Sequence, residues 1–557
     1  MARRLASFVL LLILILAMPL VAFAGSAGAD AKLDALLRAR AAAPRGLSRV
    51  IIRSTRGGSA AAALKKAGGI AGRRLAAVDG QVALLPDVAL LELAASPDIL
   101  SIALDRRVHG AMERTSAAIG ASWVRDELGF DGSGVGVAII DSGVANWHDD
   151  LGSERVTHFA DFITYLPSAH DEYGHGTHVA GIIAGSGFDS GGARRGVAPG
   201  ASLIVLKVLD GAGDGYISNV IAAIDYAIEQ RARFNIRVLN LSVSAGVFES
   251  YATDPFTLAA KRAVDAGIVV VTAAGNLGRN DRGQVQHGGI TAPGNAPWVL
   301  TVGASHHHRT VSRADDTLAA FTSRGPTNID RESKPDLVAP GVGIESLAAA
   351  GSTIYNTASA ARLRGTIDTP TSPYLALTGS SMSAPVVAGT VALMLQANPS
   401  LTPNLVKAIL QYTAERSARY ESSAQGAGFL NARGAVQLAG TLRNGASIST
   451  GGRDPSPWSR EIIWGGHRVR GGVLTAGATA WRPEVVWGAS TTAEGDDIVW
   501  GTSLDGETEW RGGGEAELSA LDTPVHVAGW ASFVLAGIAP DDRRRLRSAP
   551  LMEARGF

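Results

Sequence analysis

Three residues of the types that cooperate in nucleophilic catalysis lie far apart in this chain. Asp141 ends the apolar run 137–140, His175 lies between two glycines at the start of a helical pattern, and Ser381 lies in a Gly/Ser-rich turn before another. A serine hydroxyl is barely ionised at neutral pH, so an imidazole must take its proton, and a buried anion must fix the tautomer of that imidazole. The residue types and their order predict a base-activated hydroxyl nucleophile.

Each residue alone has a simpler interpretation. An Asp-Ser-Gly sequence after a strand is often only a turn. His175 and His178 could pack in a core or bind a metal, although the sequence has no HExxH and no cysteine to complete a zinc site. Ser381 could be a helix N-cap. All three simple interpretations would have to hold together, and in this order, so the catalytic interpretation is preferred.

The runs around these residues resemble the signature blocks of subtilisin-like serine proteases, the subtilases. They are Asp-Ser-Gly at 141–143, Gly-His-Gly-Thr-His at 174–178 and Gly-Ser-Ser-Met-Ser-Ala-Pro at 379–385. The resemblance implies a triad of Asp141, His175 and Ser381. It also implies that Asn276, which ends an apolar run from Val269, donates to the oxyanion of the reaction, with the backbone N–H of Ser381 as second donor.

A further run, 238–246, resembles the block whose strand edge binds the substrate backbone by main-chain hydrogen bonds. Subtilases commonly have Gly where this chain has Ser244, so we expect a more crowded pocket for the residue before the cleaved bond. The candidate substrate-binding residues are Ser242, Val243, Ser244, Ala273, Ala274 and Gly275.

Short β-branched runs alternate with helical patterns between residues 115 and 440. This alternation predicts an α/β fold with a parallel sheet and helices on both faces. Asp141 and Asn276 both follow strand patterns, where ligands bind in such sheets. We expect residues 115–440 to form a subtilisin-like catalytic domain.

The N-terminal part has two expected segments. Residues 1–24 read as a signal peptide, with Arg3 and Arg4 before a long apolar run and Ala22-Phe23-Ala24 as a cleavage site; an uncleaved anchor is the alternative. Residues 25–112 contain a β-α-β-β-α-β pattern, the small ferredoxin-like α+β arrangement. In this position it resembles the subtilase propeptide, a folding chaperone and inhibitor, removed by a cut near 108–115. The alternative is a structural domain that stays attached.

The C-terminal part differs from the family. Residues 441–460 read as a Gly/Ser/Pro-rich linker, and residues 461–557 repeat a short theme of two β-branched residues, Trp and Gly, at 462–465, 485–488 and 498–501. This theme suits short strands and turns. We expect a β-rich appendage that packs on itself or on the catalytic domain; the alternative is a carbohydrate- or surface-binding module with exposed Trp.

Composition restricts the partners. The chain has 557 residues, with Lys+Arg and Asp+Glu both 51, so no strongly basic surface supports nucleic-acid binding, and no firm membrane partner is expected. It has no cysteine, so disulfides cannot stabilise it. No cofactor is required for the chemistry. Structural calcium is possible through carboxylates such as Asp171 and Asp336, although no EF-hand spacing is present.

The sequence thus predicts a secreted or cell-envelope-associated serine endopeptidase that is made as a self-processing zymogen. Its partners would be protein or peptide substrates and its own propeptide as inhibitor. Two other functions remain open: a catalytically silent binding protein with the protease fold, and an esterase. The lack of a G-x-S-x-G sequence around Ser381 argues against the esterase.

Overall fold

The computed structural model describes residues 26–55, 59–105, 107–110, 118–308, 310, 312–443, 458–464, 467–470, 487–491 and 497–500. The expected signal peptide and most of the expected linker lie outside these residues. The chain divides into two compact units. The first comprises residues up to Arg106 together with 248–258, and the second comprises Arg107–Val247 and the chain from Ala259 onward.

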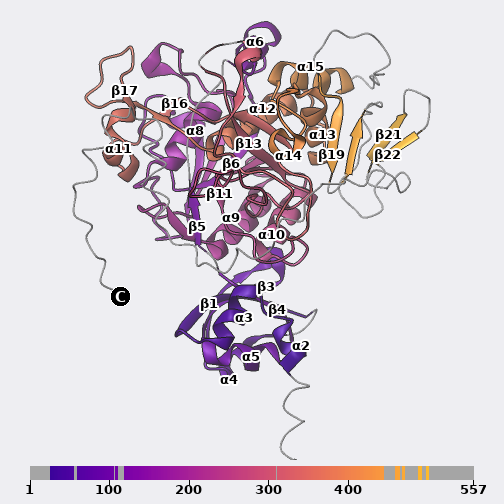
Figure 1. Cartoon of the computed structure of the whole chain (residues 1–557). Coiled ribbons are helices and arrows are strands. Elements are labelled where there is room, and N and C mark those ends of the chain that lie inside the picture. Colours follow the sequence, from indigo (N-terminus) through magenta and orange to yellow (C-terminus); the bar gives the residue numbers. More distant parts are fainter. Residues whose placement is uncertain are drawn as a thin grey trace, which may run out of the picture. The chain divides into compact units, whose positions relative to one another are not determined.

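The first unit is an antiparallel sheet with helices (Figure 1), in the strand order β2-β3-β1-β4. After α2 (Ser26–Asp30) and α3 (Ala35–Ala42), its elements are β1 (Leu47–Ser54), α4 (Ala61–Lys66), β2 (Ile70–Leu75), η1 (Ala76–Val78), β3 (Gly80–Pro86), η2 (Asp87–Ala89), α5 (Leu90–Ala94) and β4 (Ile99–Leu104). This is the expected β-α-β-β-α-β order. Apolar residues such as Val50, Ile52 and Leu85 form its core.

The second helix of this pattern begins irregularly. The segment after β3 starts as the 3-10 turn η2 and becomes α-helical only from Leu90. The buried carboxylate of Asp87 accepts hydrogen bonds from the Ser48 hydroxyl (2.5 Å) and the Arg45 N–H (2.8 Å). These bonds hold the start of the segment to the first residues of β1 and the chain just before it, and the regular helix starts after them.

The second unit is built on a sheet of eight strands in the order β14-β13-β12-β10-β6-β8-β7, with β15 also paired to β13. Only the β13–β14 pair is antiparallel. The β-branched residues of the inner strands are buried on both faces, as a parallel sheet requires. The strands are β6 (Gly136–Asp141), β7 (Val156–Asp161), β8 (Ser202–Lys207), β10 (Ile236–Leu241), β12 (Val269–Ala273), β13 (Leu300–His306), β14 (Thr317–Leu318) and β15 (Leu337–Pro340).

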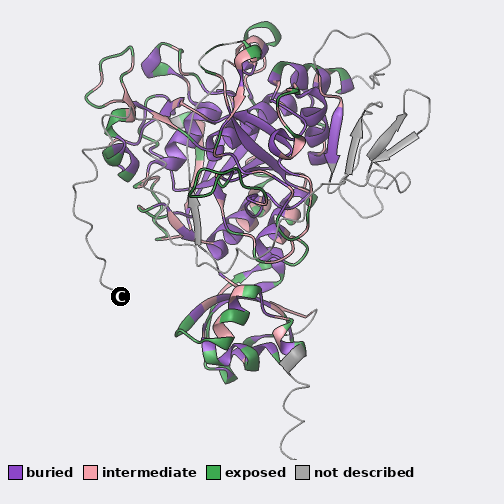
Figure 2. Ribbon diagram, viewed as in Figure 1, coloured by how far each residue is buried: buried purple, intermediate pink, exposed green. Residues whose placement is uncertain are grey.

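Helices cover both faces of this sheet, as predicted (Figure 1). The long helices are α8 (His175–Ala184), α9 (Ile217–Gln230), α10 (Pro255–Asp265), α12 (Ser380–Ala397), α13 (Pro403–Thr413) and α15 (Ala432–Arg443). Shorter ones are α6 (Ala121–Leu128), α7 (Gly152–Arg155), η3 (Phe188–Ser190), η4 (Arg313–Asp315), α11 (Thr353–Thr357), η5 (Ser359–Ala361) and α14 (Ser422–Gln425). Among the described residues α12 alone is long and apolar enough to cross a membrane, but it lies in the core of this unit (Figure 2).

Short strands form smaller sheets in the second unit. β5 (Arg107–Gly110) lies between β9 (Asp214–Tyr216) and β11 (Val243–Ser244), antiparallel to both. β18 (Tyr374–Leu377) lies between β16 (Ile344–Leu347) and β17 (Arg362–Leu363). In the C-terminal extension β19 (Glu461–Trp464) pairs with β20 (His467–Arg470), and β21 (Trp487–Thr491) pairs with β22 (Asp497–Trp500).

A buried ionic cluster joins α13 to the sheet. The Asp336 carboxylate, 1% exposed, accepts hydrogen bonds from the ammonium groups of Lys334 and Lys407, both at 2.9 Å, and from the side-chain amide of Gln411, also at 2.9 Å. Lys407 also donates to the carbonyls of Pro297 (2.6 Å) and Val299 (3.1 Å). Two cations thus share one anion, and burial lowers the pKa of Lys407 to about 7.

This lowered pKa predicts a pH-dependent stability. In the unfolded chain a lysine titrates near pH 10.4, so between about pH 7 and 10 the unfolded chain binds more protons at position 407 than the folded chain does, and stability rises with pH. We expect Lys407→Met to remove up to about 1.4 kcal/mol per pH unit of this rise. Urea unfolding at pH 7 and pH 9.5 measures it. The surface variant Lys261→Met should keep the parental pH dependence, and an unchanged slope in Lys407→Met would refute the assignment.

Candidate active site

The structure brings Asp141 and His175 together. Asp141 is the last residue of β6, His175 is the first residue of α8, and both side chains are fully buried. Nδ1 of His175 lies 2.6 Å from Oδ1 of Asp141. A carboxylate can only accept, so Nδ1 carries the proton and Nε2 of the neutral ring keeps its lone pair. The imidazole is therefore oriented as a base whose protonated form is stabilised by a neighbouring anion.

Two glycines make this approach of strand and helix possible. A Cβ on Gly176 would lie 2.2 Å from the carbonyl oxygen of Gly143, and a Cβ on Gly143, where φ is +121°, would lie 2.0 Å from that of His170. Backbone atoms cannot yield as a flexible side chain can, so any larger residue would push α8 away from the end of β6. The glycines of the Asp-Ser-Gly and Gly-His-Gly sequences thus set the distance between Asp141 and His175.

Asp171 fixes the same junction by hydrogen bonds. Its Oδ1 accepts from the Ser142 hydroxyl (2.8 Å) and the Gly174 N–H (2.7 Å). Its Oδ2 accepts from the Thr177 N–H (2.8 Å) and the Thr177 hydroxyl (2.6 Å). One carboxylate therefore ties the residue after Asp141 to the residues on both sides of His175. The sequence suggests Asp171 only as a calcium ligand, because its contact with Ser142 depends on the fold and spacing does not reveal it.

Ser381 lies in the first turn of α12, which packs against α8. Pro385, inside this helix, has no N–H for the carbonyl four residues earlier, which is that of Ser381. The freed carbonyl accepts a hydrogen bond from the Ser242 hydroxyl (2.8 Å), which in turn accepts from the Asn240 amide (2.9 Å). The candidate nucleophile and the candidate substrate-binding segment are thereby joined directly.

Asn276 is oriented by the start of the same helix. The backbone N–H of Ser380 donates to Oδ1 of Asn276 (2.9 Å), and the N–H of Gly275 donates to the Ser380 hydroxyl (3.2 Å). Because an N–H can only donate, the oxygen of the amide must face Ser380, and its NH₂ group is turned away from the helix. An amide donor half-buried beside the first turn of α12 is suitably placed to bind an anion.

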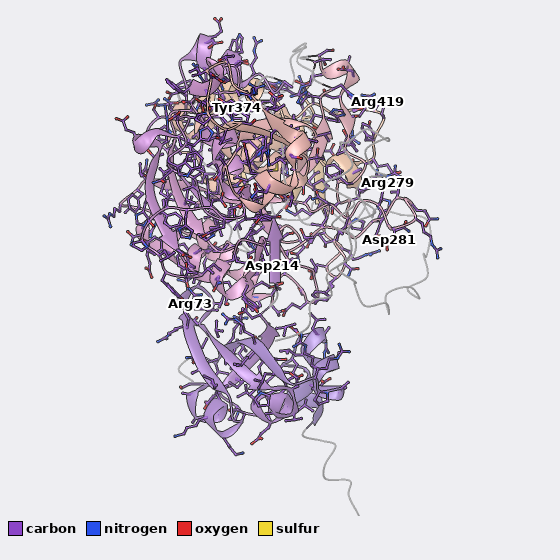
Figure 3. The ribbon with its side chains drawn as sticks, turned by 90° about the vertical axis from the view of Figure 1, so that its left-hand side faces the viewer. Arg73, Asp214, Arg279, Asp281, Tyr374 and Arg419 are labelled. Atoms are coloured by element: carbon purple, nitrogen blue, oxygen red, sulfur yellow. The ribbon has the colours of Figure 1, made fainter. Side chains whose placement is uncertain are left out.

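The candidate substrate-binding residues fall into two groups. Ser242 is buried before β11, which Val243 and Ser244 form and which pairs with β5. Ala273 ends β12, and buried Ala274 and Gly275 lead from it to Asn276. The second strand beside β5 is β9, where Asp214 is labelled in Figure 3. An extended segment of this chain thus occupies a three-stranded sheet beside the Ser242–Ser381 contact.

Asp141 and the residue after it make further polar contacts. Besides the imidazole, Oδ1 of Asp141 accepts the Ser142 N–H (2.7 Å). The buried ammonium of Lys207 donates to the Ser142 carbonyl (2.6 Å) and to Glu172 (2.8 Å). Burial and the nearby Asp141 raise the pKa of Tyr173 to about 12, so this phenol stays neutral.

The carboxylates suggested for calcium are already satisfied by protein donors, Asp171 by four hydrogen bonds and Asp336 by its lysines and Gln411. Within the described part of the chain, His148, Asp150 and Asp189 form a buried group that could hold a metal. Asp150 accepts from the Tyr374 hydroxyl, labelled in Figure 3, and from the Asp189 N–H, both at 2.8 Å. Burial and Asp150 raise the pKa of Asp189, which reduces the charge available to a cation.

The hydrogen bonds of Asp171 give a testable prediction. Asp171→Asn replaces one oxygen by an NH₂ group that faces donors, so at least one buried donor loses its acceptor, at a cost of about 1–3 kcal/mol in unfolding free energy. We also expect the low-field NMR signal of the His175 Nδ1 proton to broaden or move. The control is the exposed carboxylate of Asp149, where Asp149→Asn should change neither. A stable Asp171→Asn protein with an unchanged signal would contradict this role.

Comparison with known proteins agrees with this geometry. A model of the subtilase family (peptidase family S8) matches residues 132–434. Serine protease AprX of Bacillus subtilis is 36% identical over 345 residues, which are 61% of this chain and 74% of AprX. Subtilisin E of the same species is 31% identical over 382 residues, 67% of this chain and 85% of that protein. The crystal structure of fervidolysin from Fervidobacterium pennivorans superposes with a TM-score of 0.54 at 21% identity, covering 70% of this chain and 61% of fervidolysin, and supports the fold.

The matched region covers more than half of the chain and contains every candidate site residue. The α/β fold predicted from the sequence is confirmed by this family and by the structural neighbour. The chain belongs to the subtilase family and is a serine-type endopeptidase.

Proposed function

We propose that this endopeptidase cleaves proteins through a triad of Asp141, His175 and Ser381. The observation that supports the proposal best is the buried Nδ1–Oδ1 hydrogen bond of 2.6 Å between His175 and Asp141. This bond leaves Nε2 of His175 as the basic nitrogen. His175 begins α8, which packs against α12, the helix that carries Ser381. As Oγ of Ser381 bonds to the substrate carbonyl carbon, its proton passes to Nε2, and Asp141 stabilises the imidazolium.

The negative charge then on the carbonyl oxygen needs donors that are in place beforehand. Asn276 would supply its side-chain NH₂, oriented by the Ser380 N–H, and Ser381 its backbone N–H at the start of α12. One such donor lowers the barrier by about 3–4 kcal/mol. When the C–N bond breaks, the imidazolium gives its proton to the leaving nitrogen. Water then attacks the acyl-enzyme, His175 takes a water proton, and Ser381 recovers its own.

The substrate would bind as an additional strand. The space between β9 and β11 already accepts the extended segment β5, antiparallel to both neighbours. Main-chain hydrogen bonds on two sides bind a peptide with little regard to its sequence, and the side-chain pockets select among peptides. The side chain of Ser244, where subtilases commonly have Gly, would narrow one of these pockets and favour a small residue before the cleaved bond.

The position of β5 supports self-processing. Its register pairs Gly110 with Val243 and His109 with Ser244, so β5 ends opposite the residue that follows Ser242. Because Ser242 contacts the backbone of Ser381, we place the cut just after the end of β5, at the bond after Ala111. We therefore assign residues 25–111 as a propeptide that is cut from the catalytic domain and inhibits it through β5, and residues 1–24 as an export signal. The enzyme would then act outside the cell or in its envelope.

Chemical labelling tests the proposed nucleophile. A fluorophosphonate should label the processed enzyme at Ser381, and Ser381→Ala should lose both labelling and casein hydrolysis, the latter by roughly a million-fold. Ser383→Ala is the matched control and should keep both. Labelling without casein hydrolysis but with short-ester hydrolysis would favour an esterase. A chain that neither reacts nor hydrolyses would be a silent binding protein.

N-terminal sequencing tests the proposed cut. We expect the secreted enzyme to begin at Met112 and the Ser381→Ala chain to retain the residues before it. Cleavage more than two residues from this bond would show that β5 does not occupy the substrate position in the register described. Cleavage of the Ser381→Ala chain at the same bond would assign the cut to another protease.

A further inference from the structure

The three Trp-Gly repeats of the C-terminal extension share one more feature. Each begins with an acidic residue, so the repeated unit has five positions: acid, two β-branched residues, Trp and Gly. The units are Glu-Ile-Ile-Trp-Gly at 461–465, Glu-Val-Val-Trp-Gly at 484–488 and Asp-Ile-Val-Trp-Gly at 497–501. The structure describes how the first four residues of the first unit, strand β19, lie against the catalytic domain.

Gln411 of α13 binds the backbone of β19 as a neighbouring strand would. Its Oε1 accepts from the Ile463 N–H (2.7 Å), and its Nε2 donates to the Ile463 carbonyl (3.2 Å). The same Nε2 donates to Asp336 (2.9 Å), which can only accept, so the amide orientation is fixed before any strand arrives. Because both bonds go to main-chain atoms, this contact accepts any extended segment.

The side chains of the first unit add the selectivity. Glu461 is completely buried and forms an ion pair with Arg416. Ile462 and Ile463 are 2% and 1% exposed, and Ile463 packs between Ala414 and Ala427. We call Gln411, Ala414, Arg416 and Ala427 the unit slot. It recognises an acid followed by two β-branched residues, and the second and third units carry the same three positions.

We propose that the unit slot is a binding site for these repeats and that the second and third units of one copy bind the slot of a second copy. Each chain contains three units, whereas its described residues form one slot, so two units are left over to bind elsewhere. Replacing the first unit by another keeps the two backbone bonds to Gln411, the ion pair and the β-branched contacts, so exchange of like segments between copies costs little energy. The C-terminal extension is then a device for association of the enzyme with itself.

The chain's own first unit competes with that of a second copy. Only residues 444–460 separate it from α15, so its effective concentration at the slot is in the millimolar range. Association therefore requires concentrated enzyme or a slot whose own first unit has been displaced. This competition suggests a test in which the charge of the slot is reversed.

The test uses two full-length variants in a Ser381→Ala background, which prevents self-digestion. Arg416→Glu repels all three acidic units of its own chain and leaves its slot open. The double variant Glu484→Arg, Asp497→Arg keeps its own first unit bound and presents arginines in the other two. In sedimentation velocity each variant alone should be monomeric, and their mixture should form a heterodimer. Glu494→Arg, a charge reversal outside the units, is the matched control for the second variant and should form none.

A second measurement covers the case in which Arg416→Glu does not fold. The chain has no cysteine of its own. When an Ala414→Cys chain is mixed with a Val486→Cys chain, every disulfide that forms therefore joins residues at position 414 or 486. We expect a mixed dimer whose yield rises with protein concentration and falls when Glu484→Arg is added to the second chain. A single Ala414→Cys, Ile463→Cys chain should close internally. If neither the heterodimer nor the mixed disulfide forms, the proposal is wrong, whatever the outcome of the tests of the triad.

Discussion

The close approach of the end of β6 to the start of α8 is the constraint on which the site depends. The hydrogen bond between Asp141 and His175 exists only because Gly143 and Gly176 let two backbones meet where a Cβ would overlap a carbonyl oxygen. Asp171 then holds the junction with four hydrogen bonds. Backbone packing fixes the orientation of the imidazole in the folded protein. The entropy lost in orienting it is therefore lost once, during folding, and not at each turnover.

The other half of the site is fixed by a different device. A proline inside α12 removes one helical hydrogen bond, and the carbonyl thus released, that of Ser381, is bound by Ser242. Ser242 immediately precedes the strand that pairs with β5. The register of any strand bound there is consequently tied to the position of Ser381. If the substrate binds there as proposed, this coupling would make the choice of the cleaved bond depend on main-chain register, and the side-chain pockets would add a second selection.

The sequence was sufficient for those features that local pattern determines. The alternation of strands and helices predicted the parallel sheet. The run ending in Asp141 placed this residue at a strand end, where the structure has it, whereas Asn276 lies three residues beyond the end of β12. It could not predict the roles of Asp171, Ser242 and Gln411, because each acts on a residue far away in the chain. Spacing also gave no reason to include the acidic residue before each Trp-Gly theme in the repeat, because the ion pair of Glu461 with Arg416 forms only in the folded chain.

Without disulfides, this chain must join its segments by burial and ion pairs. The carboxylate of Asp336 joins several of these segments. It binds Lys334 beside the sheet and Lys407 on α13, and through Gln411 it is linked to the backbone of β19. When Lys407 is protonated, two ammonium groups at one carboxylate leave an excess positive charge in the core, which is unfavourable unless polar groups surround it. The carbonyls of Pro297 and Val299 provide them. The same cluster therefore holds the last helices of the catalytic domain in place and orients the amide that receives the C-terminal strand, so that stability and docking depend on one buried anion.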